Sequence, residues 1–194
     1  MDNAITRIGM PLHEFIEEGN TQPFELINGE RRYKAPTVYG HSKTLRAMFR
    51  ALDAYVVSHE LGEVFSETTF ILPEAYDSDW VKGSRIPDIM LIMGQRLAEF
   101  AAKTPDAEGR PIAVIPDLVI EVVSPTDKAS EFDEKVDMYL ADGVQWVITL
   151  DPQRRKAHVY SSDSDHPIVL KGDAILRIAD LLPGFEVPLR QVFE

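Results

Sequence analysis

The sequence contains no cysteine, and none of its hydrophobic runs approaches the length of a membrane span. Disulfides and thiolate metal sites are therefore excluded. The N-terminus lacks the basic-then-apolar order of a signal peptide, so a cytoplasmic protein is expected. Positive charge is also scarce, because 20 Lys and Arg face 32 Asp and Glu and give a net charge of -12. This charge argues against a protein that coats nucleic acid, while local binding through metal ions and a small basic patch stays compatible with it.

Two short apolar segments carry carboxylates where a protein core favours hydrocarbon. Asp88 follows Pro87 and precedes the run IMLIM, and Glu121 lies inside the run VIEVV. Runs of this kind predict strands that are buried on both faces. Burial of an ionised carboxylate is costly unless the group is paired, hydrogen-bonded or bound to metal. We therefore expect Glu121 to have a partner, and the candidates are Lys135, one element later, and a divalent metal ion.

The whole pattern predicts one α/β domain over residues 1–194, with a mixed sheet flanked by helices and an N-terminal helix and hairpin. The hairpin is expected to turn at Asn28-Gly29. Helices are expected at 11–18, 41–59 and 130–141, the last after a start at Ser124–Asp127, and a short helix with a loop is expected at 95–111. Strands are expected at 63–72, 87–93, 117–123, 144–150, 156–161 and 167–171.

Each candidate residue also has a plain structural interpretation. Asp88 suits a turn before a strand, Glu121 suits a salt-bridged edge, and Lys135 suits a solvated helix face with ordinary ion pairs. Together, however, two carboxylates and a lysine are the set that phosphodiester hydrolysis needs. Carboxylate oxygens hold Mg²⁺ or Mn²⁺ and leave positions for water and phosphate, and a nearby lysine orients the water.

Four segments carry a family resemblance: FELINGE, PDIMLIM, PDLVIEVVSPTD and DEKVDMYLADGVQWVITLDPQRRKAHVY. They resemble the Uma2 family, which is described as a restriction endonuclease family and belongs to the PD-(D/E)XK nuclease superfamily. The resemblance extends over the chain from Pro11 to Phe185. It implies a restriction-endonuclease-like core, in which a mixed sheet is flanked by helices.

The resemblance also implies roles for individual residues. Asp88 and Glu121 match the two metal-binding acids of the superfamily. The superfamily lysine usually stands two residues after the glutamate, where this chain has Val123, so Lys135 on the following helix takes its place. Glu25 matches a third acid that completes the metal site, and a hairpin salt bridge is its alternative interpretation.

Two further residues are expected to meet the substrate. His41 matches a recurrent family position, where it would contact phosphate or the site, or else cap its helix. Ser124 would orient Glu121 or donate to phosphate, although entry into the next helix alone explains a serine there.

The sequence therefore predicts a Mg²⁺- or Mn²⁺-dependent endonuclease that cleaves DNA as a homodimer and has no contact with membranes. The loops at 73–85 and 95–111 would shape its groove. Two alternatives stay open: a non-catalytic scaffold that kept the fold, and a hydrolase of a small phosphorylated ligand, which would suit the acidity better. Two basic clusters would contact a phosphate backbone or are exposed turn residues: Arg154, Arg155 and Lys156, and Arg31, Arg32 and Lys34.

Overall fold

The computed structural model describes residues 8–73, 76–77, 79–125 and 129–194. The expected helix start at Thr126 and Asp127 lies outside these residues, as does part of the 73–85 loop. The chain divides into two compact units. One contains the described residues up to Ala35 together with Thr69–Ile86 and Glu99–Ile115, and the other contains Pro36–Thr68, Pro87–Ala98 and Pro116–Glu194. Within the described residues, no helix is both long and apolar enough to cross a bilayer.

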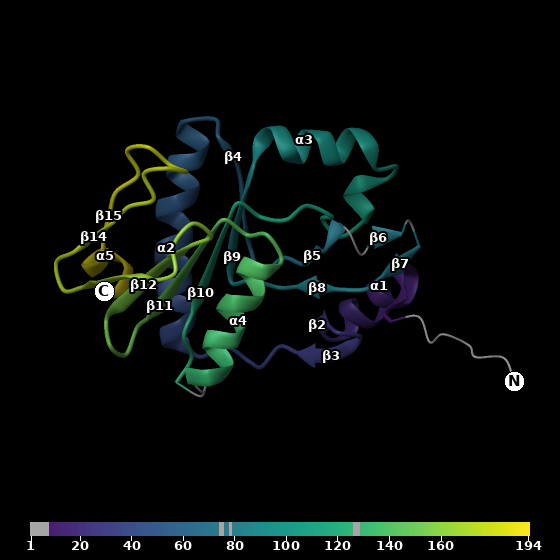
Figure 1. The fold of residues 1–194 in the computed structure, drawn as a ribbon, viewed down its shortest axis with the longest axis horizontal. Coiled ribbons are helices and arrows are strands. Elements are labelled where there is room, and N and C mark those ends of the chain that lie inside the picture. The colour runs from purple at the N-terminus through teal and green to yellow at the C-terminus, as the bar shows by residue number, and fades with distance from the viewer. Residues whose placement is uncertain (1–7, 74–75, 78, 126–128) are drawn as a thin grey trace, which may run out of the picture. The chain divides into compact units, whose positions relative to one another are not determined.

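The first unit is built from a short helix and small antiparallel sheets (Figure 1). Its hairpin turns at Asn28 and Gly29, whose φ angles of 52° and 84° suit the tight turn that Asn-Gly favours, so the predicted hairpin is confirmed. Its elements are β1 (Met10–Pro11), α1 (Leu12–Thr21), β2 (Phe24–Ile27), β3 (Glu30–Tyr33), β5 (Phe70–Ile71), β6 (Tyr76–Asp77), β7 (Trp80–Val81), β8 (Ser84–Arg85) and a 3-10 helix (Ala107–Gly109). The helix α3 (Gly94–Lys103) begins in the second unit and ends in the first.

The second unit contains a six-stranded mixed sheet in the order β13-β12-β11-β10-β9-β4. Only β10 and β11 are parallel among these described strands, and the other neighbouring pairs are antiparallel. The strands are β4 (Gly62–Ser66), β9 (Ile89–Met93), β10 (Leu118–Val122), β11 (Trp146–Asp151), β12 (Lys156–Ser161) and β13 (Ile168–Lys171). The predicted α/β class with a mixed sheet and flanking helices is confirmed.

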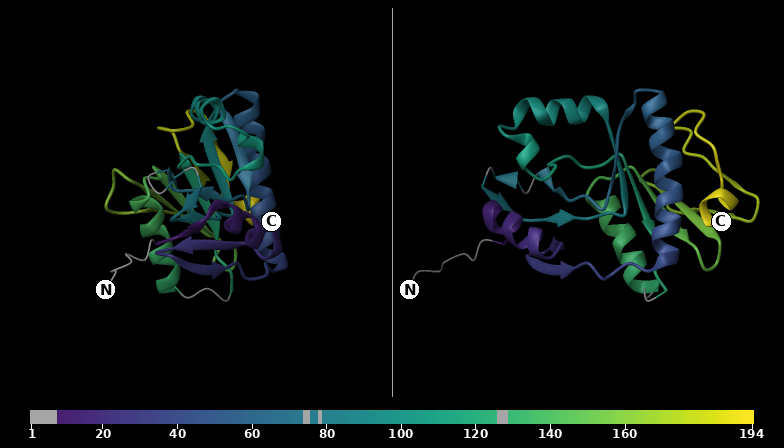
Figure 2. Two further views of the ribbon diagram at one scale, coloured as in Figure 1. Left: turned by 90° about the vertical axis from the view of Figure 1, so that its right-hand side faces the viewer. Right: turned by 180° about the vertical axis from the view of Figure 1, so that it is seen from behind.

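Two helices cover opposite faces of this sheet: α2 (Tyr39–Ser58) and α4 (Ala129–Ala141) (Figures 1 and 2). Buried side chains of α2, such as Met48 and Leu52, pack on Ile120 and Val122 of β10 in one core cluster. Because side chains alternate along a strand, Glu121 points to the other face, where α4 lies. The C-terminal segment adds β14 (Ile175–Leu176), β15 (Val187–Pro188) and α5 (Leu189–Phe193).

The expected single strand at 63–72 is wrong. β4 ends at Ser66, and β5 begins at Phe70 and pairs with β8 in the first unit. Glu67 has a φ of 48°, in the left-handed region, which interrupts an extended strand. The apolar alternation continues across this break, so the pattern gives no sign of it.

Candidate active site

Asp88 directly precedes β9, and Glu121 lies in the neighbouring strand β10, at one end of the six-stranded sheet. The register of β9 and β10 pairs Ile89 with Ile120, and Asp88 and Glu121 are the next residues of the two segments toward that end. Both side chains are buried, with 3% exposure each. The backbone N–H of Val122 donates a hydrogen bond to Asp88 Oδ2 at 2.8 Å. The backbone of β10 therefore fixes the Asp88 carboxylate at the end of the sheet where Glu121 lies.

His41 lies in the first turn of α2 and contacts Asp88 directly. Its Nε2 is 3.0 Å from Asp88 Oδ2, and its side chain is buried. His41 thus belongs to the same cluster as Asp88 and orients this carboxylate.

Lys135 and Tyr139 of α4 both reach Glu121 from the other side. The Lys135 ammonium lies 2.9 Å from Glu121 Oε1, and the Tyr139 hydroxyl donates to the same oxygen at 2.6 Å. Residues four apart share one face of a helix, and Lys135 Nζ lies 5.8 Å from the centre of the Tyr139 ring. One face of α4 therefore supplies the cation and the hydroxyl that hold a buried carboxylate.

Tyr139 is a member of the cluster to which the sequence analysis assigned no role. It is fully buried, and a buried tyrosine on a helix is usually explained by packing alone. The available signal was its position one turn after Lys135, on the face predicted to meet Glu121.

Glu25 and Ser124 are two further residues to which the sequence assigned roles at the site. Glu25 belongs to the first unit, where its buried carboxylate accepts a hydrogen bond from the Ile86 N–H at 2.8 Å. Ser124 is half-buried and stands two residues after the end of β10. Their roles as metal ligand and substrate contact stay predictions.

Asp117 is a buried carboxylate with a structural function. Its Oδ2 accepts the Met93 N–H at 2.8 Å, and its Oδ1 accepts a hydrogen bond from Arg96 at 2.8 Å. These bonds fasten the end of β9 to the start of β10. Asp117 therefore serves the junction between the two strands rather than the proposed site.

The resemblance implies a divalent metal ion, which needs several ligand atoms from the chain, the substrate or water. In the described part of the chain, no three His, Asp or Glu side chains converge as metal ligands. Mg²⁺ and Mn²⁺, however, are often bound through one or two carboxylates, with water and phosphate oxygens completing the shell. Asp88 and Glu121 are buried hard-oxygen donors at one end of the sheet. The chemistry of these two donors fits a two-carboxylate site that substrate and water would complete.

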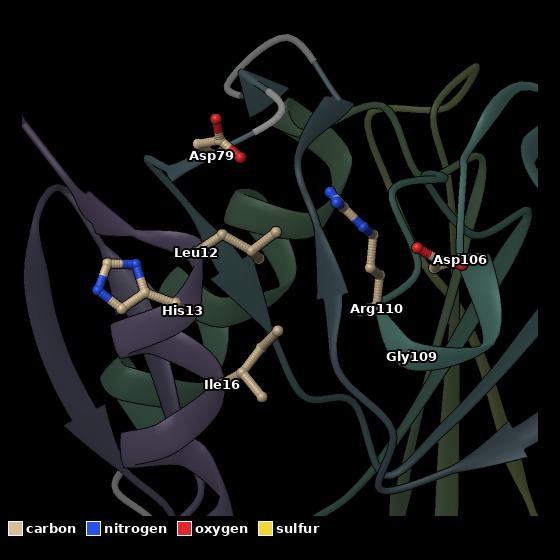
Figure 3. Close-up of a pocket in the computed structure, with 7 residues that line it drawn as sticks. All are labelled: Leu12, His13, Ile16, Asp79, Asp106, Gly109 and Arg110. Atoms are coloured by element: carbon tan, nitrogen blue, oxygen red, sulfur yellow. The ribbon is translucent and has the colours of Figure 1, made fainter.

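A pocket of about 340 Å³ lies elsewhere, in the first unit (Figure 3). The side chains of Leu12 and Ile16 point from α1 toward Arg110 across it. Its lining consists of Leu12, His13, Ile16, Asp79, Asp106, Gly109 and Arg110. It contains none of the predicted site residues.

Of the two basic clusters, the one that contains Arg31 and Lys34 is used largely by the fold. Arg31 forms two hydrogen bonds with Glu18, at 2.6 and 2.9 Å, and Lys34 donates to the Ile86 carbonyl at 2.9 Å. In the second cluster, Arg154 pairs with Asp151 at 3.0 Å. Arg155 and Lys156 continue that turn into β12.

Comparisons with known proteins identify a family and a similar fold. The Uma2 family model, described as "Putative restriction endonuclease", matches residues 11–190. The fold is similar to the crystal structure of "a putative nuclease belonging to DUF820" from Anabaena variabilis ATCC 29413. That likeness has a TM-score of 0.73 and 19% sequence identity, and it covers 95% of this chain and 97% of the other. A search of curated proteins finds no match.

Proposed function

The chain belongs to the Uma2 family, and we propose that it is a metal-dependent endonuclease that hydrolyses phosphodiester bonds of DNA. The observation that carries this proposal is that one end of the sheet holds two buried carboxylates and a lysine. Asp88 directly precedes β9, Glu121 lies in β10, and the Lys135 ammonium lies 2.9 Å from Glu121. Two carboxylates and a lysine are the set that metal-assisted hydrolysis requires.

Asp88 and Glu121 would hold Mg²⁺ or Mn²⁺, with Glu25 as a further proposed ligand. When bound, the ion would lower the pKa of a coordinated water and offset negative charge in the transition state. His41 holds the Asp88 carboxylate from α2, at 3.0 Å, and so fixes the direction of a ligand.

Lys135 would orient the attacking water and favour its hydroxide form. Its ammonium is half-buried beside Glu121, so its charge is only partly screened by solvent. Ser124, just past the end of β10, would donate a hydrogen bond to a phosphate oxygen. A second copy of the chain would help to build a groove, because a net charge of -12 repels DNA from a single copy.

A second candidate function is a non-catalytic scaffold. The favouring observation is that Asp88 and Glu121 already have hydrogen-bond donors from the chain itself: Val122, His41, Lys135 and Tyr139. A buried polar network with satisfied groups can serve the fold alone. The two candidates differ in whether the cluster binds metal and turns over substrate.

The test is nicking of supercoiled plasmid in Mg²⁺ or Mn²⁺ by the wild type and by Glu121→Gln. Parallel reactions contain an RNA duplex and a small aryl phosphodiester. The proposal predicts nicked plasmid from the wild type and none from the variant. Hydrolysis of the small ester alone would favour the small-ligand hydrolase, and no hydrolysis in any reaction would favour the scaffold.

A further inference from the structure

A group of cations lies at the same end of the sheet as Asp88 and Glu121. β10 and β11 are parallel and end side by side, with Val122 opposite Leu150. The turn at 152–155 therefore begins beside the end of β10, and β12 begins there at Lys156. β13 ends at this edge with Lys171, directly opposite Lys156.

Two of these cations, Lys156 and Lys171, also lie on the side of the sheet to which Glu121 points. Glu121 pairs with Thr149, and Thr149 pairs with His158, so the three side chains share a face. Lys156 is two residues before His158 and shares that face, as does its partner Lys171. Strands are about 4.8 Å apart, so β12 lies roughly 10 Å from β10.

Two features of this group do not serve the fold. Lys156 and Lys171 are a like-charge pair at directly opposite positions, which destabilises a sheet. Arg155 has a φ of 49°, in the left-handed region that glycine adopts more readily than arginine. Glycine at 155 and a neutral residue at 171 would remove both features, which points to a use outside the fold.

The cations of this edge form no ion pairs, although carboxylates lie near them. Asp151 is opposite Lys156, but its carboxylate binds the side chain and the N–H of Arg154. In the described part of the chain, no carboxylate forms an ion pair with Arg155, Lys156 or Lys171. Burial lowers the pKa of His158, Lys156 and Lys171 lower it further, and Asp151 and Asp133 act in the opposite direction.

We propose that Arg155, Lys156 and Lys171, the basic edge, bind the phosphate backbone of a nucleic acid whose scissile phosphate lies at Asp88 and Glu121. The proposal rests on the proposed function for the position of the scissile bond. One strand of a duplex carries a phosphate about every 3.4 Å of helix axis, so a backbone that passes the two carboxylates reaches the basic edge within about three nucleotides. This patch also accounts for local binding by a chain of net charge -12.

The test is the affinity for a fluorescent 20-base-pair DNA duplex, measured by anisotropy against salt concentration. Glu121→Gln is the parent, because it removes a site carboxylate and no cation. The variants are Arg155→Gly, which suits the turn, and the pair Lys156→Gln and Lys171→Gln, which removes the like-charge contact. Arg190→Gln on α5 is the matched control, since it removes one exposed positive charge elsewhere.

At 0.1 M salt we expect each lost phosphate contact to weaken binding about eightfold, and the slope of log affinity against log salt to fall by about 0.9. Thermal stability of Arg155→Gly should equal or exceed that of the parent, while Arg190→Gln should bind within about twofold of it. Single-stranded DNA and an RNA duplex, run in parallel, identify the polymer that the edge prefers.

Four results would overturn the basic edge as a nucleic-acid surface. They are variants that bind DNA as tightly as the parent, a loss of affinity in Arg190→Gln as large as in the edge variants, displacement of the DNA by polyglutamate as efficient as by unlabelled DNA, and no nucleic-acid binding by the parent. The proposed function is judged separately by plasmid nicking. If the wild type nicks plasmid but the edge variants keep the DNA affinity of the parent, only the nucleic-acid surface is refuted. If DNA affinity depends on the edge but no plasmid is nicked, only the nuclease is refuted.

Discussion

Glu121 receives two donors on a single oxygen, one charged and one neutral. The Lys135 ammonium and the Tyr139 hydroxyl meet at Oε1, at 2.9 and 2.6 Å. Hydrogen bonds to a charged acceptor are stronger than neutral ones, so this carboxylate has a well-defined direction. A metal site requires ligands whose orientation is fixed before the metal binds. Removing the Lys135 ammonium or the Tyr139 hydroxyl, one at a time, distinguishes the roles of these two donors.

Substitution Lys135→Met tests the role of the lysine. The positive charge of Lys135 beside Glu121 repels a metal ion, so Mn²⁺ affinity in the variant should equal or exceed that of the wild type. Plasmid nicking should fall roughly a hundredfold, because the charge that orients the water is lost. Unfolding free energy should fall by about 2 kcal/mol as Glu121 loses a buried partner.

Calorimetry with Mn²⁺ and initial nicking rates measure both effects. The control is Lys103→Met, which removes an exposed lysine paired with Glu99 at 3.5 Å. A Lys135→Met variant that nicks at the wild-type rate would show that the lysine only neutralises its neighbour.

Substitution Tyr139→Phe tests whether the hydroxyl positions Glu121. The ring and its packing are kept, while the 2.6 Å hydrogen bond is lost. We expect Mn²⁺ affinity to fall at least tenfold, as is usual when the partner of a metal ligand is removed. The unfolding free energy should fall by about 1.5 to 3 kcal/mol.

Tyr55→Phe provides the matched comparison, because the Tyr55 hydroxyl donates to the Pro183 carbonyl away from the site. This control should keep the wild-type Mn²⁺ affinity. If both variants bind Mn²⁺ equally well, Tyr139 is a packing residue and not a positioning one.

At the scale of elements, β12 carries both Lys156 of the basic edge and, two residues later, His158. Burial lowers the pKa of this imidazole, Lys156 and Lys171 lower it further, and Asp151 and Asp133 act in the opposite direction. A histidine with a lowered folded pKa binds its proton more readily in the unfolded chain, whose ordinary value is near 6.5. Its contribution to stability is therefore complete above that value and is lost as the pH falls below it.

We expect His158→Gln to reduce the loss of stability between pH 7 and pH 5. Urea denaturation of both proteins across this range measures the difference. His166→Gln, at an exposed position, should leave the pH dependence as it is in the wild type. Parallel curves for the wild type and His158→Gln would contradict the assignment.

Local pattern was sufficient to predict some elements. The α2 helix follows from apolar residues at spacings of three and four, and β10 follows from a continuous apolar run. β4 was extended too far because the left-handed Glu67 leaves no trace in the hydrophobic pattern. The short α5 was not foreseen among the prolines of the C-terminal segment.

The site was predicted where a residue breaks a local rule. Asp88 and Glu121 are carboxylates beside or within apolar runs, and such residues need partners. Tyr139 breaks no rule, because its ring is buried as an aromatic side chain ordinarily is. Its contact with Glu121 depends on how α4 packs on β10, which is a tertiary arrangement that spacing along the chain does not fix.

On the scale of the whole molecule, the local charge near the proposed site differs from the net charge of the chain. The chain has a net charge of -12, yet the sheet end with Asp88 and Glu121 also carries the basic edge. Local attraction at one edge can coexist with general repulsion, because salt screens distant charges more than near ones. The single domain expected over residues 1–194 stays a prediction beside the two compact units.

The most direct measurement of the proposed site is a calorimetric Mn²⁺ titration of the wild type, Asp88→Asn and Glu121→Gln. Asp117→Asn is the control, because Asp117 is a buried carboxylate that fastens β9 to β10 and lies outside the proposed metal ligands. We predict that the wild type and the control bind Mn²⁺ and that both site variants lose this binding. A wild type that binds no Mn²⁺, or site variants that bind it as the wild type does, would contradict the metal site on which the nuclease rests.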